Sequence, residues 1–314
     1  MTPYKMKIIF FGSSHFAVSS LKALSAEGHN VLCVVTQPDK KKGRGLHFGP
    51  TLVKQEAQAR GLQIYQPTQI NTPECADFLK AFNADLFVVI AYGQILSKEI
   101  LSIPLNFCIN IHASMLPAYR GAAPINWAII NGEKATGISI IKLSEKMDAG
   151  PVIMQKSFPI HDNDSFTSLE QRLADSGAEL LIESIKSIIK QDYKLIPQDK
   201  NKISFAPKLK KSDGLIKWER PAQEINNLVR GALAWPFAFT YYKGKILKIY
   251  ESSVLAGEGF SPGVIMDISK NGITVSTGKG SFLIKELQLE GKRHMHAEEF
   301  IAGHKLSIGE KLGK

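Results

Sequence analysis

The stretch KIIFFG, from Lys7 to Gly12, decides the fold class that the sequence predicts. This short, almost wholly apolar run ends at a glycine, which is typical of a strand buried on both faces of a parallel sheet. A helical pattern follows and closes at Gly28, and the alternation continues through NVLCVVT, VKQEAQARG, CADFLKAFN and DLFVVIAYG. Strands and helices that alternate at short intervals predict an α/β fold with a doubly wound, mostly parallel sheet.

The pattern of predicted helices and strands changes in the last part of the chain. A long amphipathic helix is expected from Ser168 to Lys190, and the polar, lysine-rich segment after it is twice interrupted by proline, which is typical of a linker. Short strands separated by Gly, Ser and Asn turns then favour a small β-barrel, in KILKIYESS, GVIMDIS, GITVSTG and GSFLIKELQ. We therefore expect a first domain over residues 1–190, a linker over 191–206 and a barrel domain over 207–314.

Composition excludes several classes of protein. Hydrophobic residues make up 44% and charged residues 22%, which is ordinary for a globular enzyme. No apolar run approaches the roughly 18 residues of a membrane-spanning helix, and the N-terminal apolar run is too short for a signal peptide, so we expect a cytoplasmic protein. The odd number of cysteines and the lack of a CxxC pair argue against a disulfide scaffold or a zinc module, and favour buried thiols at Cys33, Cys75 and Cys108.

The chain is basic, with 39 basic and 29 acidic residues and a net charge of +10. The residues after position 206 carry the larger part of this excess. A basic protein suits an anionic partner, of which nucleic acid is the largest candidate, although charge alone serves solubility equally well.

Well-known nucleotide and nucleophile motifs are missing from the sequence. Gly12 opens GSSHFA rather than the GxGxxG dinucleotide fingerprint, and neither a GxxxxGK[ST] phosphate loop nor a GxSxG nucleophile elbow occurs. Cys108 precedes His112 by four residues, but along a strand that spacing separates the two by about 13 Å. A nucleophilic Cys–His pair is therefore not expected there.

Polar side chains gather instead at the ends of strands. FCINIHA ends with Asn110 and His112, and Asp148 follows the strand GISIIKL in the turn EKMDAGPVI. Ligands of such sheets bind beyond the carboxyl ends of the strands. An Asn amide and an imidazolium can stabilise an oxyanion while a carboxylate takes a proton, so the set suits acyl transfer to an amine. Two alternatives stay open: His112 as a satisfied core residue, and Asp148 as the cap of its own turn.

Longer segments carry a resemblance to a known family. The chain closely resembles the methionyl-tRNA formyltransferase family, in order, through FFGSSHFAVSSL, TQPDKKKGRG, AYGQIL, NIHASMLPAYRGAAPINWAI, GISIIKLSEKMDAGPVI, FAPKLKKSDGLIKW, WPFAFT and LQLEGKRHM. The Asn-x-His, SxLPxYRG and DAGP elements are shared with the wider family of enzymes that use 10-formyltetrahydrofolate. The resemblance implies a Rossmann-like formyltransferase fold. It also implies transfer of the formyl group of 10-formyltetrahydrofolate to the amino group of initiator methionyl-tRNA. This reaction needs no metal, and nothing in the sequence demands more than a monomer.

The same resemblance assigns roles to residues. It implies that Asn110, His112 and Asp148 are the catalytic residues of the first domain. It places the folate along the loop after His112 and against the backbone of the AYG segment, with a Leu-Pro pair framing the pterin pocket. Core packing is the alternative for Leu116, but its place in a loop favours the pocket. The residues implied for folate binding are Ala91, Tyr92, Gly93, Ser114, Met115, Leu116, Pro117, Tyr119 and Arg120.

Basic residues in two regions are candidates for contact with tRNA. The loop PDKKKGRG reads from sequence alone as a solvated, mobile loop, whereas the resemblance implies that it reaches the acceptor end of the tRNA. The C-terminal barrel resembles an oligonucleotide-binding (OB-like) fold, which holds nucleic acid through positive charge and stacking. Trp218, Trp235 and Phe237 are expected to fill its core. The residues expected to contact tRNA are Lys40, Lys41, Lys42, Arg44, Lys208, Lys210 and Lys211.

Other functions fit parts of the sequence. They are formyl transfer to a nucleotide sugar or to glycinamide ribonucleotide, hydrolysis of the formyl donor, and RNA binding by a protein whose folate domain is inert. The charged loop and the basic second domain argue against a small substrate, which needs neither. The presence of Asn110, His112 and Asp148 argues against an inert folate domain.

Overall fold

The structure, a computed structural model, describes residues 4–42, 47–257 and 260–313. The chain divides into two compact units. The first comprises Met1–Gly121, Thr136–Phe158 and Glu170–Ala206, and the second comprises Ala122–Ala135, Pro159–Leu169 and Pro207–Lys314.

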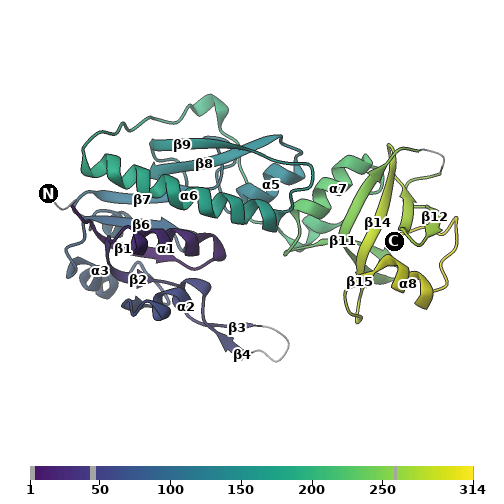
Figure 1. Cartoon of the computed structure of the whole chain (residues 1–314), viewed down its shortest axis with the longest axis horizontal. Helices are drawn as coiled ribbons and strands as arrows, with labels where there is room; N and C mark the ends of the chain where they lie inside the picture. Colours follow the sequence, from purple (N-terminus) through teal and green to yellow (C-terminus); the bar gives the residue numbers. More distant parts are fainter. Residues whose placement is uncertain (1–3, 43–46, 258–259, 314) are drawn as a thin grey trace. The chain divides into compact units, whose positions relative to one another are not determined.

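The first unit is built on a mostly parallel sheet (Figure 1). Its strands are, in spatial order, β5 (Ile64–Tyr65), β2 (Asn30–Val35), β1 (Lys7–Gly12), β6 (Leu86–Ile90), β7 (Phe107–His112), β8 (Ala135–Lys142) and β9 (Val152–Pro159). The pairs from β5 through β7 are parallel, and β7 pairs with β8 antiparallel. The predicted doubly wound α/β sheet is confirmed. The near-continuous apolar runs of β1 and β6 arise because both faces of these strands are covered.

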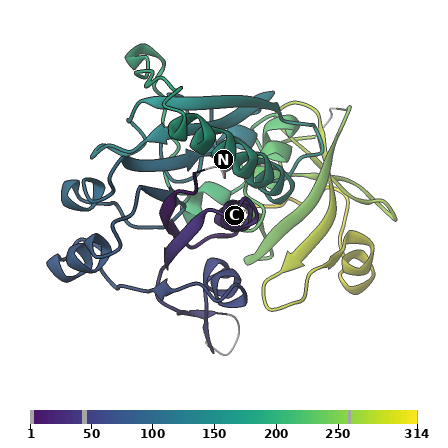
Figure 2. The same cartoon turned by 60° about the vertical axis from the view of Figure 1, so that its left-hand side comes forward.

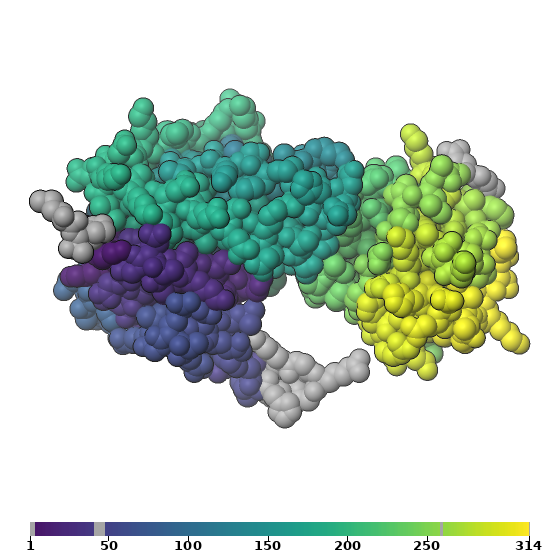
Figure 3. Space-filling model, viewed as in Figure 1, coloured from purple at the N-terminus to yellow at the C-terminus, as the bar shows by residue number. Residues whose placement is uncertain are grey.

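Helices cover both faces of this sheet. On one face α1 (Val18–Ala26) and α6 (Phe166–Ile189) lie side by side, as Figures 1 and 3 show, and the Ser19 hydroxyl on α1 donates to Asp175 on α6. Gly177 lets α6 approach the sheet, because a Cβ there would lie 3.3 Å from Ile111. On the other face α3 (Pro73–Lys80) and α4 (Lys98–Leu101) pack against β6 and β7. The remaining helices are η1 (His15–Ala17), α2 (Leu52–Ala59) and η2 (Lys200–Lys202).

A two-stranded hairpin leaves the sheet after β2 (Figure 2). Its strands β3 (Lys40–Lys42) and β4 (His47–Gly49) pair antiparallel. Asp39 anchors the base of the hairpin through an ion pair of 2.8 Å with Lys54 and a hydrogen bond from Gln66. Residues 43–46 lie outside the described part of the chain.

The second unit holds an antiparallel sheet. Its strands are, in spatial order, β10 (Ala238–Tyr242), β11 (Lys245–Leu255), β14 (Ser281–Leu289), β13 (Gly272–Ser276) and β12 (Ile265–Ser269), with β15 (Met295–His296) beside β14. The helices of this unit are α5 (Pro124–Ile130), η3 (Lys211–Gly214), α7 (Ala222–Gly231) and α8 (Ala297–Gly303). The Asn126 amide on α5 donates to the Gly231 carbonyl on α7. The sheet is consistent with the small barrel that the sequence predicts.

The tryptophans of this unit differ in their surroundings. Trp218 fills the core as expected, edge-on to Phe282 with ring centroids 5.7 Å apart. The same expectation is wrong for Trp235, which is 50% exposed. Trp235 and Phe237 lie in the turn between α7 and β10, so the inward and outward alternation of a strand does not direct them into the core.

Within the described residues, no helix combines the length and apolar character that crossing a membrane requires.

Core packing of α6 predicts the effect of truncating Leu173, which is fully buried. We expect Leu173→Ala to lower the free energy of unfolding by about 2–5 kcal/mol, because it leaves a cavity in a packed interior. The exposed Glu183 on the same helix is the control, and Glu183→Ala should change stability by less than about 0.5 kcal/mol. Chemical denaturation of both variants measures this, and equal effects would contradict the assignment of α6 to the core.

Candidate active site

Strand register brings several loops together at one edge of the first sheet. Val89 on β6 pairs with Asn110 on β7, so the turn that begins at Ala91 lies level with His112. Gly12, the last residue of β1, pairs with Ile90 at the same edge. This is the carboxyl edge of the parallel strands, where ligands of such sheets bind.

Asn110 and His112 point to the same face of β7, because side chains two residues apart on a strand share a face. Ile111 between them points to the opposite face, toward Gly177 of α6. Within the described residues the Asn110 side-chain amide has no hydrogen-bond partner of the protein, although it is only partly exposed. Its two N–H donors therefore remain for a ligand.

The His112 ring is held between a carbonyl and a carboxylate. Its Nε2 lies 2.8 Å from the backbone carbonyl of Tyr119, and its Nδ1 lies 3.6 Å from Oδ1 of Asp148. A carbonyl oxygen can only accept, so Nε2 must carry a proton in the neutral as well as the charged ring. The other ring nitrogen, Nδ1, faces the carboxylate. His112 is buried, and each of its ring nitrogens faces a polar group of the protein.

Asp148 is directed toward His112 by a contact from another loop. Its side chain is 12% exposed, and its Oδ2 accepts the backbone N–H of Gly121 at 2.9 Å. This bond spans 27 residues, so it is not the local cap that was the alternative for Asp148. Asp148 itself has φ +50°, in the left-handed region that Asp adopts more often than most residues with a Cβ. The second oxygen, Oδ1, is left to face the imidazole.

The position of Gly121 is fixed by residues that come much later in the chain. Arg120 donates its N–H to the Ser204 carbonyl at 2.9 Å and accepts from the N–H of Ala206 at 2.7 Å. Gly121 has φ +126°, and a Cβ on it would lie 2.5 Å from the Ala206 carbonyl oxygen. Only glycine fits this approach. Residues of the segment 191–206, whose composition is that of a linker, thus build part of the site.

Comparison with known proteins shows the family of this chain. The family model described as formyl transferase matches residues 6–185, and the model of its C-terminal domain matches residues 208–305. A methionyl-tRNA formyltransferase of Acetivibrio thermocellus is 44% identical over 98% of this chain and 100% of its own length. That of Thermodesulfovibrio yellowstonii is 46% identical over 96% of this chain and 97% of its own. The chain belongs to the methionyl-tRNA formyltransferase family. The resemblance drawn from the motifs is confirmed.

Solved structures share the fold with this formyltransferase family member at low identity. HypX from Aquifex aeolicus in complex with tetrahydrofolic acid has a TM-score of 0.66 at 17% identity, over 95% of this chain and 47% of HypX. WlaRD, a sugar 3N-formyl transferase, has a TM-score of 0.67 at 21% identity, over 92% of this chain and 100% of WlaRD. At these identities the likeness concerns the fold alone.

The formyltransferase loop after His112 is held in place by two polar residues that sequence reasoning missed, the buried Ser139 and the partly exposed Gln155. The Ser139 hydroxyl on β8 donates to the Ser114 carbonyl at 2.6 Å and accepts the N–H of Leu116 at 3.0 Å. Gln155 on β9 donates to both Ser139 and the Leu116 carbonyl. The one visible signal was a serine inside the apolar strand GISIIKL, since a polar group in a buried strand needs partners.

The side chains of this loop differ in what they offer a ligand. Leu116 is 5% exposed and packs against Ile141 and Val152, so the expectation that its loop position disfavours core packing is wrong. The loop folds back onto β8 and β9, which creates a small core there. The Ser114 hydroxyl donates to Ala118, and Met115 lies over Gly137. Pro117 follows Leu116 through a cis bond, Tyr119 has φ +60°, and the Arg120 guanidinium donates to Gln198.

The AYG segment presents backbone at the same edge. Ala91 and Gly93 are exposed and have φ of +45° and +94°, whereas the Tyr92 side chain is buried against Phe11. The Ser13 hydroxyl donates to the Tyr92 carbonyl. What this segment offers next to His112 is therefore peptide groups, with its one large side chain turned into the core.

The predicted tRNA-contacting residues fall into three groups. Lys40 is exposed on the hairpin, the side chains of Lys41 and Lys42 are outside the described residues, and Arg44 lies wholly outside them. Lys208, Lys210 and Lys211 are exposed in the second unit.

Cysteine chemistry does not enter the site. The described cysteines, Cys33, Cys75 and Cys108, are free and buried. Burial raises the pKa of the Cys33 thiol to about 12 and also raises the pKa of Cys108. Such thiols are inert at neutral pH. Among the described residues, no cluster of three His, Cys, Asp or Glu side chains forms a metal site.

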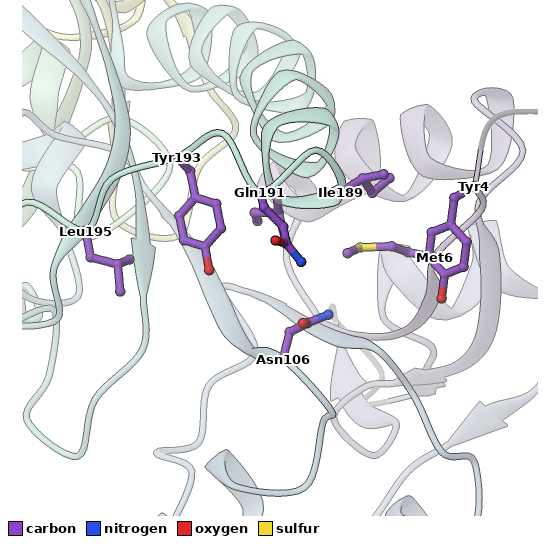
Figure 4. Close-up of a pocket in the computed structure, with 8 residues that line it drawn as sticks. Tyr4, Met6, Asn106, Ile189, Gln191, Tyr193 and Leu195 are labelled. Carbon is purple, nitrogen blue, oxygen red and sulfur yellow. The ribbon is translucent and has the colours of Figure 1, made fainter.

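A hollow of about 600 Å³ lies elsewhere on the first unit (Figure 4). Tyr4 and Met6 before β1, Asn106 before β7, and Gln191 and Tyr193 beyond α6 contribute to its wall. Tyr4, Met6 and Asn106 precede the strands that end at Gly12 and His112, so the hollow lies at the opposite end of these strands. It is not part of the candidate active site.

The close approach at Gly121 yields a prediction for Gly121→Ala. The added Cβ collides with Ala206 and displaces the N–H that holds Asp148, so we expect formyl-transfer turnover to fall by about 100-fold. Gly61→Ala is the matched control, because Gly61 also has positive φ but nothing within 4 Å of its Cβ position. That variant should lose about 1–2 kcal/mol of stability without losing turnover. Similar turnover in both variants would contradict the role given to the Gly121 N–H.

Proposed function

We propose that this protein transfers the formyl group of 10-formyltetrahydrofolate to the amino group of initiator methionyl-tRNA, the formylation that prepares the tRNA for translation initiation. The single observation that carries the proposal is the facing pair of His112 Nδ1 and Asp148 Oδ1 at the carboxyl edge of the sheet, 3.6 Å apart. It occurs in a chain that is 44% identical over 98% of its length to a methionyl-tRNA formyltransferase.

Asn110 and His112 stabilise the charge that develops during attack. The methionine amine forms a bond to the formyl carbon, and the electrons of the carbonyl bond move to the formyl oxygen. The Asn110 amide and the protonated His112 Nδ1 are the donors for that oxygen, and both are held on a strand before substrate binds. One such donor is typically worth about 2.7–4 kcal/mol of barrier.

Asp148 takes the proton that the attacking amine must lose. Its Oδ1 is the oxygen available for this role, because Oδ2 accepts from Gly121 and Oδ1 lies 3.6 Å from His112 Nδ1, beyond hydrogen-bond distance. When the bond from the formyl carbon to N10 of the folate breaks, the departing nitrogen regains a proton from the same acid.

The folate lies along residues 114–120 with its pterin ring against the backbone of residues 91–93. Two features support this assignment: the exposed peptide groups at Ala91 and Gly93, and the nearness of that turn to His112 through the β6–β7 register. The HypX structure with the same fold holds tetrahydrofolic acid. The formyl donor is a co-substrate, and no metal takes part in the proposed mechanism.

The tRNA is bound by both units in this proposal. The hairpin lysines and Arg44 contact the acceptor end, and Lys208, Lys210 and Lys211 neutralise phosphates. Residues 1–190 are the catalytic domain, 191–206 connect it to the next, and 207–314 are the tRNA-binding domain. The enzyme acts as a monomer in the cytoplasm, the compartment of translation.

A labelled formyl donor tests the function directly. Incubation with charged initiator tRNA should place the label on the methionine amine. Uncharged tRNA, and methionyl-tRNA whose amine is already acetylated, should receive none. Labelled formate released equally with and without tRNA would instead indicate hydrolysis of the donor.

The proton-accepting role of Asp148 predicts the effect of Asp148→Asn. The amide has the shape of the carboxylate but cannot take a proton, so we expect kcat to fall by roughly 10²–10⁴-fold. The Kd for methionyl-tRNA should stay within about twofold, because Asp148 touches the reacting groups and not the tRNA backbone. Single-turnover kinetics and a binding titration measure the two quantities. A variant with the wild-type rate would contradict the role.

Phosphate binding by the second unit predicts a salt effect for the double variant Lys208→Ala, Lys210→Ala. Plots of log affinity for tRNA against log salt should become shallower by roughly 0.7–0.9 per lost phosphate contact. The control is Lys134→Ala with Lys285→Ala, since these two lysines of the same unit are already ion-paired with Asp162 and Glu251. An unchanged slope in the first variant, or an equal change in the control, would contradict the contact.

A further inference from the structure

Gln198 lies between Arg120 and the turn of Asp148, and the proposed mechanism gives it no role so far. Its Oε1 accepts from Nε and Nη2 of Arg120, at 3.0 and 2.7 Å. Its Nε2 donates to the carbonyls of Asp148 and Gly150, at 2.8 and 2.7 Å. One amide side chain thus joins the loop after β7 to the turn that carries Asp148.

These four bonds use the whole capacity of the amide. A glutamine side chain has two N–H donors and one oxygen with two lone pairs. A guanidinium only donates and a carbonyl only accepts, so the chemistry of the neighbours fixes which end of the amide faces which partner. The reversed orientation would set N–H against N–H and oxygen against oxygen. Gln198 is therefore held in one orientation.

The two hydrogen bonds that Gln198 donates hold the turn of residues 148–150. Asp148 has φ +50°, a left-handed conformation that costs free energy in residues with a Cβ, although less in Asp than in most, and contacts with the surroundings help to hold it. Gly150 lies so close to β8 that a Cβ there would be 1.8 Å from the Lys142 carbonyl oxygen. Gln198 binds the carbonyls on both sides of Ala149, and Gly121 binds the carboxylate. Together these contacts leave Asp148 Oδ1 in one place, opposite His112.

We propose that Gln198 is a positioning residue for formyl transfer, which sets the carboxylate of Asp148 against His112 by donating to the carbonyls of residues 148 and 150. It does not touch the substrates. This inference rests on the proposed function, because it assigns Gln198 a part in that reaction. It also gives the segment 191–206 a role in catalysis, in addition to its role as the linker between the two domains.

Two variants of similar volume distinguish the hydrogen bonds that the Gln198 amide donates from those that it accepts. Gln198→Met removes all four hydrogen bonds and keeps the volume. Gln198→Glu keeps the acceptor for Arg120 but sets an oxygen against the two carbonyls. We expect both variants to lower kcat by about 10–100-fold, as for the loss of a group that orients a catalytic side chain. For Gln198→Glu the KM values for methionyl-tRNA and for the formyl donor should stay within about twofold.

The control is Asn201→Leu, an amide-to-apolar change at an exposed position of the same segment, which should keep kcat. Thermal unfolding checks that each variant is folded, and Gln198→Glu decides the question if Gln198→Met does not fold. A kcat within twofold of wild type in Gln198→Glu overturns the inference. Wild-type protein that transfers no formyl group to methionyl-tRNA overturns the proposed function, and the inference with it.

A double-variant cycle shows whether Gln198 acts through Asp148. In the Asp148→Asn background, Gln198→Met should lower the single-turnover rate by less than about threefold, because residues that act as one unit are not additive. The same 10–100-fold loss in both backgrounds would mean that Gln198 acts independently of Asp148, and would overturn the inference.

Discussion

The hydrogen bond from the Gly121 backbone to Asp148 is the contact on which the rest of the site depends. It occupies one carboxylate oxygen and thereby leaves the other to face His112. The donor is a peptide group, which has no rotamer to lose and is fixed by the ladder between Arg120 and residues 204–206. The adjoining residue Tyr119 supplies the carbonyl that holds the other side of the imidazole. One short loop therefore orients both ionisable side chains.

The candidate catalytic side chains come from two kinds of backbone: a strand of the sheet, and a turn that hydrogen bonds hold in place. β7 fixes Asn110 and His112, whereas Asp148 comes from a turn whose position depends on backbone contacts and on Gln198. A site oriented before substrate binds loses little energy to reorganisation during the reaction, which is the condition under which fixed dipoles and charges lower a barrier most. Gly121 and Gly150 are part of this orientation because both allow backbone to approach backbone.

The sequence predicted the features that arise from local pattern. Apolar runs predicted the sheet because its strands are buried on both faces, and the place of Asn110 and His112 at the end of such a run predicted their edge of the sheet. Ser139, Gln155 and Gln198 escaped prediction because a single serine in an apolar strand, or a glutamine in a polar segment, has no periodic signal. Their roles come from partners 16 to 78 residues away. Leu116 and Trp235 were misjudged for the same reason, since the folding back of a loop or a turn decides whether a side chain is covered.

The most direct test of the central claim is the tautomer of His112, read from the ¹⁵N chemical shifts of its ring in labelled protein and assigned by their loss in His112→Gln. The Tyr119 carbonyl can only accept a hydrogen bond from Nε2, so the neutral ring should be the Nε2–H form. A neutral ring protonated on Nδ1 would turn the lone pair of His112 away from Asp148 and toward Tyr119, and would contradict the account.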